Sequence, residues 1–146
     1  DYMIETDKLL EEAISLTSSI ARALLSRGIM VSVVTNGTDS NGQPLLNVGE
    51  GAETKHGITV DRMLTEIAGS QGKDVFLDYL KDEIVHAKQD VLYLVVSPYA
   101  KADIIELLDR LDSGKSSVRM IVPCYDEYPY VPNRAYADGW EVPLNV

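Results

Sequence analysis

The sequence predicts an α/β fold: a mainly parallel sheet with helices on both faces and an antiparallel edge strand. Apolar runs of strand length alternate with segments of helical periodicity, the order that a parallel sheet with right-handed crossovers requires. The run Val91–Ser97 is continuously apolar, as in a strand that is buried on both faces. The chain has 146 residues, of which 45% are hydrophobic, and this is enough for one domain with a sizeable core.

The first half of the chain supplies a helix and an apolar strand. A helix is predicted from near Lys8 to Arg27–Gly28, because apolar residues recur at helical spacing and glycine favours a helix end. Ile29–Thr35 is a β-branched run that predicts a buried strand directly after this helix. Gln43–Val48 alternates weakly, so we expect an antiparallel edge strand there. Polar loops are predicted at Asn36–Gly42 and Gly49–His56.

The second half alternates helices with strands. Val91–Ser97 is predicted to be a central strand that ends at Pro98. Helical periodicity predicts helices over three segments: Ile58–Ala68, Asp74–Ala87 and Ala102–Leu111. Further strands are predicted at Val118–Pro123 and Trp140–Leu144.

The start of the chain is unusual for this fold class. A strand normally precedes the first helix, and only Tyr2–Ile4 are available for one. We therefore expect a domain excised just after its first strand, or retaining only a stub of that strand. An unfilled central position would leave strand edges open, and open edges invite pairing with the tail strand or with a second copy. The sequence thus predicts a tendency to dimerise.

Composition excludes several classes of function. The net charge is -10 and the pI is about 4.5, and no run of Lys or Arg offers a phosphate-binding patch, which argues against nucleic acid as a partner. The single cysteine, Cys124, excludes an internal disulfide and a cysteine-rich zinc site, and favours a reducing compartment. No apolar run reaches the ~18 residues of a membrane span, so the chain is not expected to cross a membrane, which leaves open that it is a soluble piece of a membrane protein.

Three segments carry a resemblance to a known family: EEAISLTSSIARALLSRGIMVSVVTNG, GEGAETKHGITVDRMLTEIA and YLVVSPYAKADIIELLDRL. They resemble the carboxyl-terminal domain of the fifty-eighth domain-of-unknown-function family, which is similar to the von Willebrand factor A fold. The resemblance covers roughly Glu11–Val122. It implies a bacterial protein with transmembrane helices upstream and this domain in the cytoplasm. It also implies a role in protein–protein interaction, with a MoxR-type AAA+ ATPase as a partner.

The family resemblance raises the question of a metal-ion-dependent adhesion site. Such a site needs Asp-x-Ser-x-Ser on the first strand, a loop threonine and a later aspartate, which supply hard oxygen ligands for magnesium or manganese. This chain has no Asp-x-Ser-x-Ser, and Ser97-Pro98 stands where Ser-Asp is required. Of the three elements of this site, the sequence matches only the loop threonine, at Thr54 or Thr59. We therefore expect no metal and no other cofactor; a metal-dependent adhesion module remains a weaker alternative.

The carboxyl ends of parallel strands are where ligands bind in open α/β sheets. Cys124 and Tyr125 belong to this edge of the predicted sheet. The residues predicted to form the interaction edge are Thr35, Asn36, Ser97, Tyr99, Asp126, Tyr128 and Trp140.

The tail is rich in aromatic residues. Aromatic side chains next to an arginine, here Arg134, are typical of interface anchors. The alternative is that the tail folds over the sheet and buries them, and the sequence favours neither. The aromatic residues are Tyr125, Tyr128, Tyr130, Tyr136 and Trp140.

An enzymatic alternative places a nucleophile at the same edge. Cys124 or Ser97 would serve a small hydrolase or transferase, and His56 is the histidine that could approach Cys124. Gly49–Lys55 superficially resembles a phosphate loop, but its spacing is wrong and two glutamates would repel phosphate. The sequence therefore favours a non-enzymatic protein-interaction domain over an enzyme.

Overall fold

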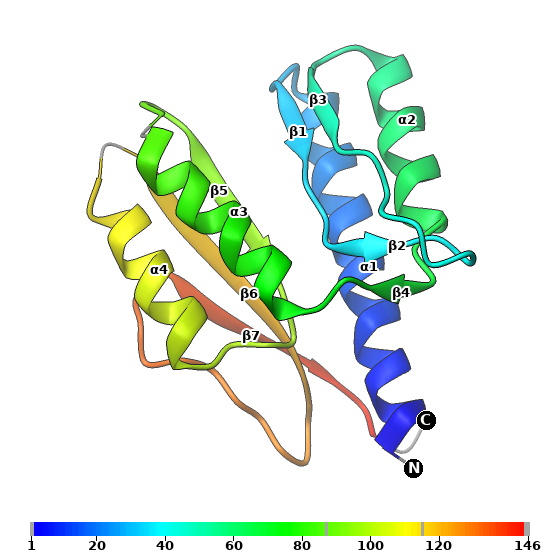
Figure 1. Cartoon of the computed structure of the whole chain (residues 1–146), viewed down its shortest axis with the longest axis vertical. Helices are drawn as coiled ribbons and strands as arrows, with labels where there is room; N and C mark the ends of the chain where they lie inside the picture. The colour runs from blue at the N-terminus through cyan, green and yellow to red at the C-terminus, as the bar shows by residue number, and fades with distance from the viewer. Residues whose placement is uncertain (1, 87, 115, 145–146) are drawn as a thin grey trace. The chain divides into compact units, whose positions relative to one another are not determined.

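The computed structural model describes residues 2–86, 88–114 and 116–144, without the side chains of residues 2–7 and 54. It divides into two compact units, which we describe separately. Unit 1 comprises Asp1–Ala13 and Leu77–Val146, and unit 2 comprises Ile14–Phe76. Mixed α/β structure is present as predicted, with four helices among the described residues (Figure 1).

Unit 1 is built on a three-stranded parallel sheet with the order β5-β6-β7. Two helices lie together on one face of this sheet in Figure 1. The strands are β5 (Leu92–Val96), β6 (Ser117–Tyr125) and β7 (Ala137–Val142), and the helices are α3 (Lys73–His86) and α4 (Ala102–Asp112).

Alternation along β6 defines the two faces of this sheet. Val118, Met120 and Val122 are almost fully buried, whereas Ser117 and Arg119, at alternate positions, are exposed. Helix α4 packs against β6 and buries the apolar stripe that its sequence predicted. We call the side bearing Val118, Met120 and Val122 the α4 face. Residues of α4 that are buried are Ile104, Ile105, Leu107, Leu108 and Leu111.

A polar contact ties strand β5 to helix α3. The Tyr93 hydroxyl donates a hydrogen bond to Glu83 Oε2 at 2.8 Å. Burial, and then this hydrogen bond to a carboxylate, raises the pKa of Tyr93 from its ordinary value of 10 to about 12. Both effects favour the neutral phenol in the folded protein.

A pH dependence follows from Tyr93. Because the pKa is raised on folding, the stabilisation is fully present below pH 10 and is lost as pH rises through about 12. We expect denaturant unfolding to show falling stability over that window, and Tyr93→Phe to reduce the fall. Equal losses in the two proteins would contradict the assignment.

Unit 2 packs two helices on short antiparallel strand pairs. Strand β1 pairs with β3, and β2 pairs with β4. Helix α1 begins in unit 1 and enters unit 2 at Ile14. The helices are α1 (Tyr2–Ser26) and α2 (Thr54–Thr65), and the strands are β1 (Val31–Val33), β2 (Gly37–Thr38), β3 (Val48–Gly51) and β4 (Gly69–Ser70).

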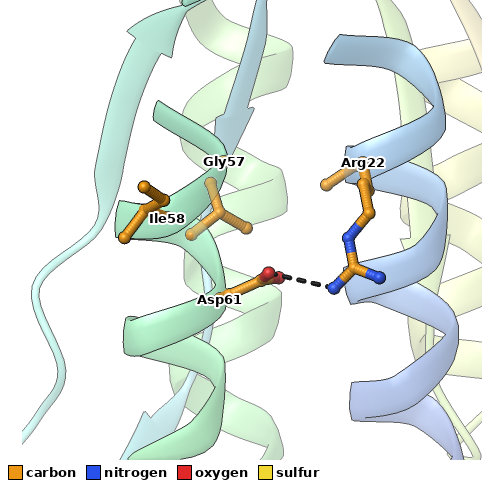
Figure 2. A pocket seen from close by; sticks show the side chains of 6 residues that line it. Arg22, Gly57, Ile58 and Asp61 are labelled. Atoms are coloured by element: carbon orange, nitrogen blue, oxygen red, sulfur yellow. Dashed lines mark hydrogen bonds and ion pairs between the residues drawn. The ribbon is translucent and has the colours of Figure 1, made fainter. Parts of the chain in front are cut away.

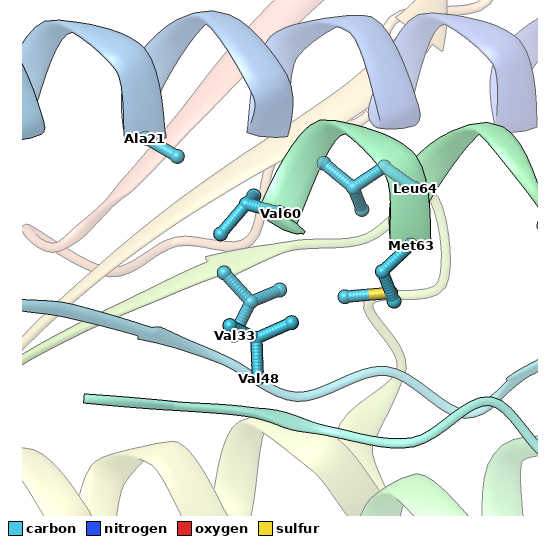
Figure 3. Packing of buried hydrophobic residues seen from close by; sticks show 6 residues of the cluster. All are labelled: Ala21, Val33, Val48, Val60, Met63 and Leu64. Carbon is cyan, nitrogen blue, oxygen red and sulfur yellow. The ribbon is translucent and has the colours of Figure 1, made fainter. Parts of the chain in front are cut away.

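The core of unit 2 joins α1, α2 and the β1–β3 pair (Figure 3). Each element contributes small or medium apolar side chains, so the helices approach the strands closely. Val60 of α2 is fully buried at the centre. The cluster consists of Ala21, Val33, Val48, Val60, Met63 and Leu64.

Two strand predictions were wrong about the partner. Ile29–Thr35 was expected in the parallel sheet, but its strand part, β1, pairs antiparallel with β3 in a separate sheet. Val91–Ser97 was expected to be central, but β5 lies at the sheet edge and β6 occupies the centre. Apolar runs specify that a strand is buried, not which strand it pairs with.

Several element boundaries also differ. The edge strand expected over Gln43–Val48 is β3, which begins at Val48. Tyr2–Ile4, the suggested strand stub, lie in the first turn of α1. The expected tail strand, Trp140–Leu144, is confirmed in part as β7. The predicted end of the third helix at Ala87 lies outside the described residues.

Candidate interaction surface

The carboxyl ends of β5 and β6 carry polar residues that are engaged locally. Ser97 Oγ donates to the carbonyl oxygen of Tyr99 at 2.9 Å and accepts the Tyr99 N–H at 3.1 Å. The Tyr99 hydroxyl donates to Asp103 at 2.8 Å. Asp126 Oδ1 accepts the N–H of Leu144 at 3.3 Å. These bonds shape the turns after the strands.

Thr35 and Asn36 lie in unit 2, after strand β1. Thr35 Oγ1 accepts the N–H of Gly37 at 3.0 Å, and Asn36 Nδ2 donates to the Gly72 carbonyl at 2.9 Å. Because β1 belongs to a different sheet from β5 and β6, one sheet edge does not carry all the predicted edge residues.

The loop between β6 and β7, residues 126–136, exposes large apolar side chains. Tyr128 is 72% exposed, Tyr130 is 52% exposed and Val131 is 43% exposed. We call these three residues the aromatic loop surface. Tyr125 and Tyr136, at the two ends of the loop, are buried. The tail aromatics therefore divide into two structural residues and an exposed group.

The aromatic loop surface is held in place from both sides. The Tyr130 hydroxyl donates to the carbonyl oxygen of Ala100 at 3.0 Å, so an exposed ring is fixed by its polar end. Arg134 makes a two-point contact with Asp109 of α4, at 2.8 and 3.0 Å. The Tyr136 hydroxyl donates to the same carboxylate at 2.8 Å. Pro129 and Pro132 further restrict the loop backbone.

The negative charge of Asp109 strengthens its contact with Arg134, which anchors the loop. The hydrogen bond from Arg134 holds the pKa of Asp109 below its ordinary value of 3.8, with a smaller contribution from the Tyr136 hydroxyl. Burial, and then the bond to Asp109, raises the pKa of Tyr136. Asp109 is thus ionised and Tyr136 neutral at neutral pH.

Trp140 lies on the other side of the sheet. A Cβ atom added at Gly139 would lie 2.6 Å from Val131 Cγ2 and 3.9 Å from Cys124 Sγ, which places the loop on the α4 face. Trp140 is the next residue, so its side chain points to the opposite face. There Trp140 Nε1 donates to Glu12 Oε1 at 2.8 Å, and the ring is 46% exposed. Trp140 and Val131 therefore belong to two different surfaces.

Cys124 and Ser97, the nucleophiles of the enzymatic alternative, make no catalytic pair with any side chain that the structure describes. Cys124 is buried and Ser97 is engaged with Tyr99. Among the described residues, no hydrogen bond joins either one to a histidine or a carboxylate. His56 lies in unit 2, where its Nε2 donates to the carbonyl oxygen of Val31 at 2.6 Å.

Two hollows lie in unit 2. One, of about 400 Å³, follows β3 and is lined by Glu50, Glu53, Lys55, His56 and Thr59 among others. The hollow is lined by side chains of both positive and negative charge, and it is open to solvent. In the part of the chain that the structure describes, no three His, Cys, Asp or Glu side chains are placed to hold a metal ion.

The second hollow, of about 230 Å³, lies between α1 and α2 (Figure 2). Arg22 Nη2 and Asp61 Oδ2 are 3.0 Å apart at its side, and Ser18 Oγ donates to Asp61 Oδ1 at 2.6 Å. The bond from Ser18, and then that from Arg22, lowers the pKa of Asp61. Gly57 of α2 is one of the residues that line the hollow.

A methyl group added at Gly57, in the wall of this hollow, is expected to stabilise the protein. A Cβ at Gly57 would lie 3.5 Å from Leu25 Cδ1, an ordinary contact, and alanine favours the helix that glycine weakens. Gly57→Ala should therefore raise the free energy of unfolding by about 0.5–1 kcal/mol in urea denaturation. Gly51→Ala is the contrast: its Cβ would lie 2.5 Å from His56 Nδ1 and should destabilise. Destabilisation by Gly57→Ala would contradict the packing described.

Comparisons with known proteins give no relative: no family model, no curated protein and no solved structure matches the chain. Among the described residues, none of the helices is both long enough and apolar enough to cross a membrane.

Proposed function

We propose that this chain is a non-enzymatic protein-interaction domain that binds its partner through the aromatic loop surface. The observation that carries the proposal is the exposure of Tyr128, Tyr130 and Val131 on a loop that is anchored at Ala100 and Asp109. Tyrosine buries a large area at low entropic cost, and a loop fixed beforehand loses little freedom on binding. Exposed apolar patches mark interaction sites on many proteins.

The charge around this surface indicates the chemistry of the partner. Asp126 and Glu127 precede Tyr128 and are exposed, and the chain carries a net charge of -10. A partner with an apolar centre and a basic rim would complement it. The resemblance in sequence implies a MoxR-type AAA+ ATPase as that partner, in the cytoplasmic domain of a membrane-anchored bacterial protein, and we include both in the proposal.

The finer fold is also part of the proposal: a three-layer arrangement similar to the von Willebrand factor A fold. Helices contact both faces of the unit 1 sheet, which supports it. Helix α4 covers one face, and on the opposite face Glu12 of α1 accepts the hydrogen bond of Trp140. Lys8 Nζ of the same helix donates to the carbonyl oxygen of Pro143.

The test compares the proteins captured from a bacterial lysate by the wild-type domain and by matched variants. Tyr128→Ser with Val131→Ser removes two of the three side chains of the aromatic loop surface and keeps Tyr130, which anchors the loop. Leu46→Ser with Val85→Ser removes apolar side chains elsewhere that are even more exposed. A partner captured by wild type and control but lost from the loop variant is the expected result, unchanged with EDTA. Equal capture by all three proteins would refute the proposed surface.

A further inference from the structure

Two Asn-Gly sequences lie close together in unit 2, Asn36-Gly37 and Asn41-Gly42. Asparagine followed by glycine is prone to spontaneous deamidation, because glycine has no side chain that hinders attack by its backbone nitrogen on the asparagine side chain. Asparagine is accordingly among the thermolabile residues of proteins. The structure places the two sequences in different surroundings, so their reactivities are expected to differ.

The Asn36-Gly37 sequence is held by hydrogen bonds. Asn36 Nδ2 donates to the Gly72 carbonyl oxygen at 2.9 Å and to Ser70 Oγ at 3.3 Å. Gly37 is buried in β2, which pairs with β4, and its N–H donates to Thr35 Oγ1 at 3.0 Å. Attack by the Gly37 nitrogen on Asn36 therefore requires these bonds to break and a buried glycine to become exposed.

The Asn41-Gly42 sequence lies on an exposed turn. In the part of the chain that the structure describes, the Asn41 side chain has no hydrogen-bond partner, and both residues are exposed. A Cβ atom added at Gly42 would meet nothing within 4 Å, so the turn is open around the glycine. The Gly42 N–H bonds to the Asp39 carbonyl oxygen at 3.1 Å, and exposed turn bonds of this kind open at little cost in free energy.

We propose that Asn41 is a site of spontaneous deamidation in the folded protein, with water as the only other reactant. The deprotonated Gly42 nitrogen attacks Asn41 Cγ, the new C–N bond closes a succinimide ring, and the Nδ2 nitrogen leaves as ammonia. Water then opens the ring at either of its carbonyl groups, which leaves aspartate or isoaspartate at position 41. No electrons are transferred, and the chain gains one negative charge beyond its net charge of -10. This inference is independent of the aromatic loop surface.

The products are expected to weaken the turn that Asp39 organises. Asp39 Oδ1 accepts the N–H of Asn41 at 2.8 Å and the N–H of Gln43 at 3.0 Å. Isoaspartate adds a methylene group to the main chain between these two donors, and both products place a second carboxylate two residues from Asp39. The modification therefore acts on the turn that joins Thr38 to its bridge partner Pro44.

The test compares three asparagines of the same chain. The wild-type protein is incubated in mildly alkaline buffer and digested with trypsin, and fragment masses of the peptide 28–55 locate the deamidated residue among Asn36, Asn41 and Asn47. Asn47 is exposed but precedes Val48, so it reports the effect of exposure without a following glycine. We expect Asn41 to react about tenfold or more faster than Asn36, and Asn47 to react slowest.

Two controls separate the structure from the sequence. In urea, where the hydrogen bonds of Asn36 are lost, both Asn-Gly sequences should react at similar rates. A carboxyl methyltransferase specific for isoaspartate should label the incubated wild-type protein and leave Asn41→Ser almost unlabelled. Equal deamidation of Asn36 and Asn41 in the folded protein would overturn the proposal. So would an Asn41 that reacts only in urea, or a difference between the two asparagines that is as large in urea as in the folded protein.

Discussion

Leu108→Ala is expected to lower the free energy of unfolding by about 2–5 kcal/mol, one of the two largest effects anticipated for a single substitution. Leu108 is fully buried in α4, on the stripe that packs against β6. Met120 of β6 is also fully buried, so the layer between helix and sheet has little room to relax around a cavity. Equilibrium unfolding in urea gives the difference directly.

Val85→Ala is the matched control for Leu108→Ala. It removes an apolar side chain from a helix of the same unit, but this side chain is exposed. We expect a change of about 0.5 kcal/mol or less. Equal effects of the two substitutions would mean that the α4 stripe does not form the core of unit 1.

Asp109→Ala is expected to release the 126–136 loop. It removes both the contact with Arg134 and the acceptor of the buried Tyr136 hydroxyl. The Ile105 carbonyl, 3.4 Å away, is a weak substitute, so the loss of stability should be about 1 kcal/mol. The larger effect falls on the loop, because it keeps the bond from Tyr130 to Ala100 but loses its ion pair with α4. Amide exchange over residues 127–133 should accelerate by about tenfold or more, as local opening requires less free energy.

Two further variants separate the contributions at Asp109. Asp109→Asn keeps an acceptor for Tyr136 but loses the charge that faces Arg134, and Arg134→Gln removes only the two-point contact. Both should accelerate exchange in the loop with less cost in stability than Asp109→Ala, since exposed ion pairs contribute little. Unchanged exchange in all three variants would show that Asp109 does not anchor the loop.

Local sequence signals predicted most helices and strands because each depends on near neighbours. The apolar spacing of Ala102–Leu111 matches α4, and the strand predicted at Val118–Pro123 matches the centre of β6. Partner choice is a different problem. Ile29–Thr35 and Val91–Ser97 have equally apolar sequences, yet one forms a short antiparallel pair and the other the edge of a parallel sheet. Pairing depends on contacts distant in sequence, which periodicity does not encode.

The sequence could predict that the candidate surface is rich in aromatic residues, but not which of their side chains are exposed or on which face of the sheet they lie. Tyr125, Tyr128 and Tyr130 are close in sequence, yet the first is buried and the other two are exposed. The difference arises from where the β6 ladder ends and where the Asp109 anchor draws the loop back to α4. Likewise Trp140 was grouped with Tyr128 as a tail aromatic. Strand alternation after Gly139 turns its side chain to the opposite face.

Site-specific photocrosslinking would test most directly whether the aromatic loop surface binds a protein. A photoreactive phenylalanine analogue replaces Tyr128 in one sample and Leu46 in another, and both samples are irradiated in cells. We predict covalent adducts with another protein at position 128 and none at position 46, and we expect Asp109→Ala to reduce the yield at 128. Equal yields at the two positions, or none at position 128, would contradict an interaction domain that works through this loop.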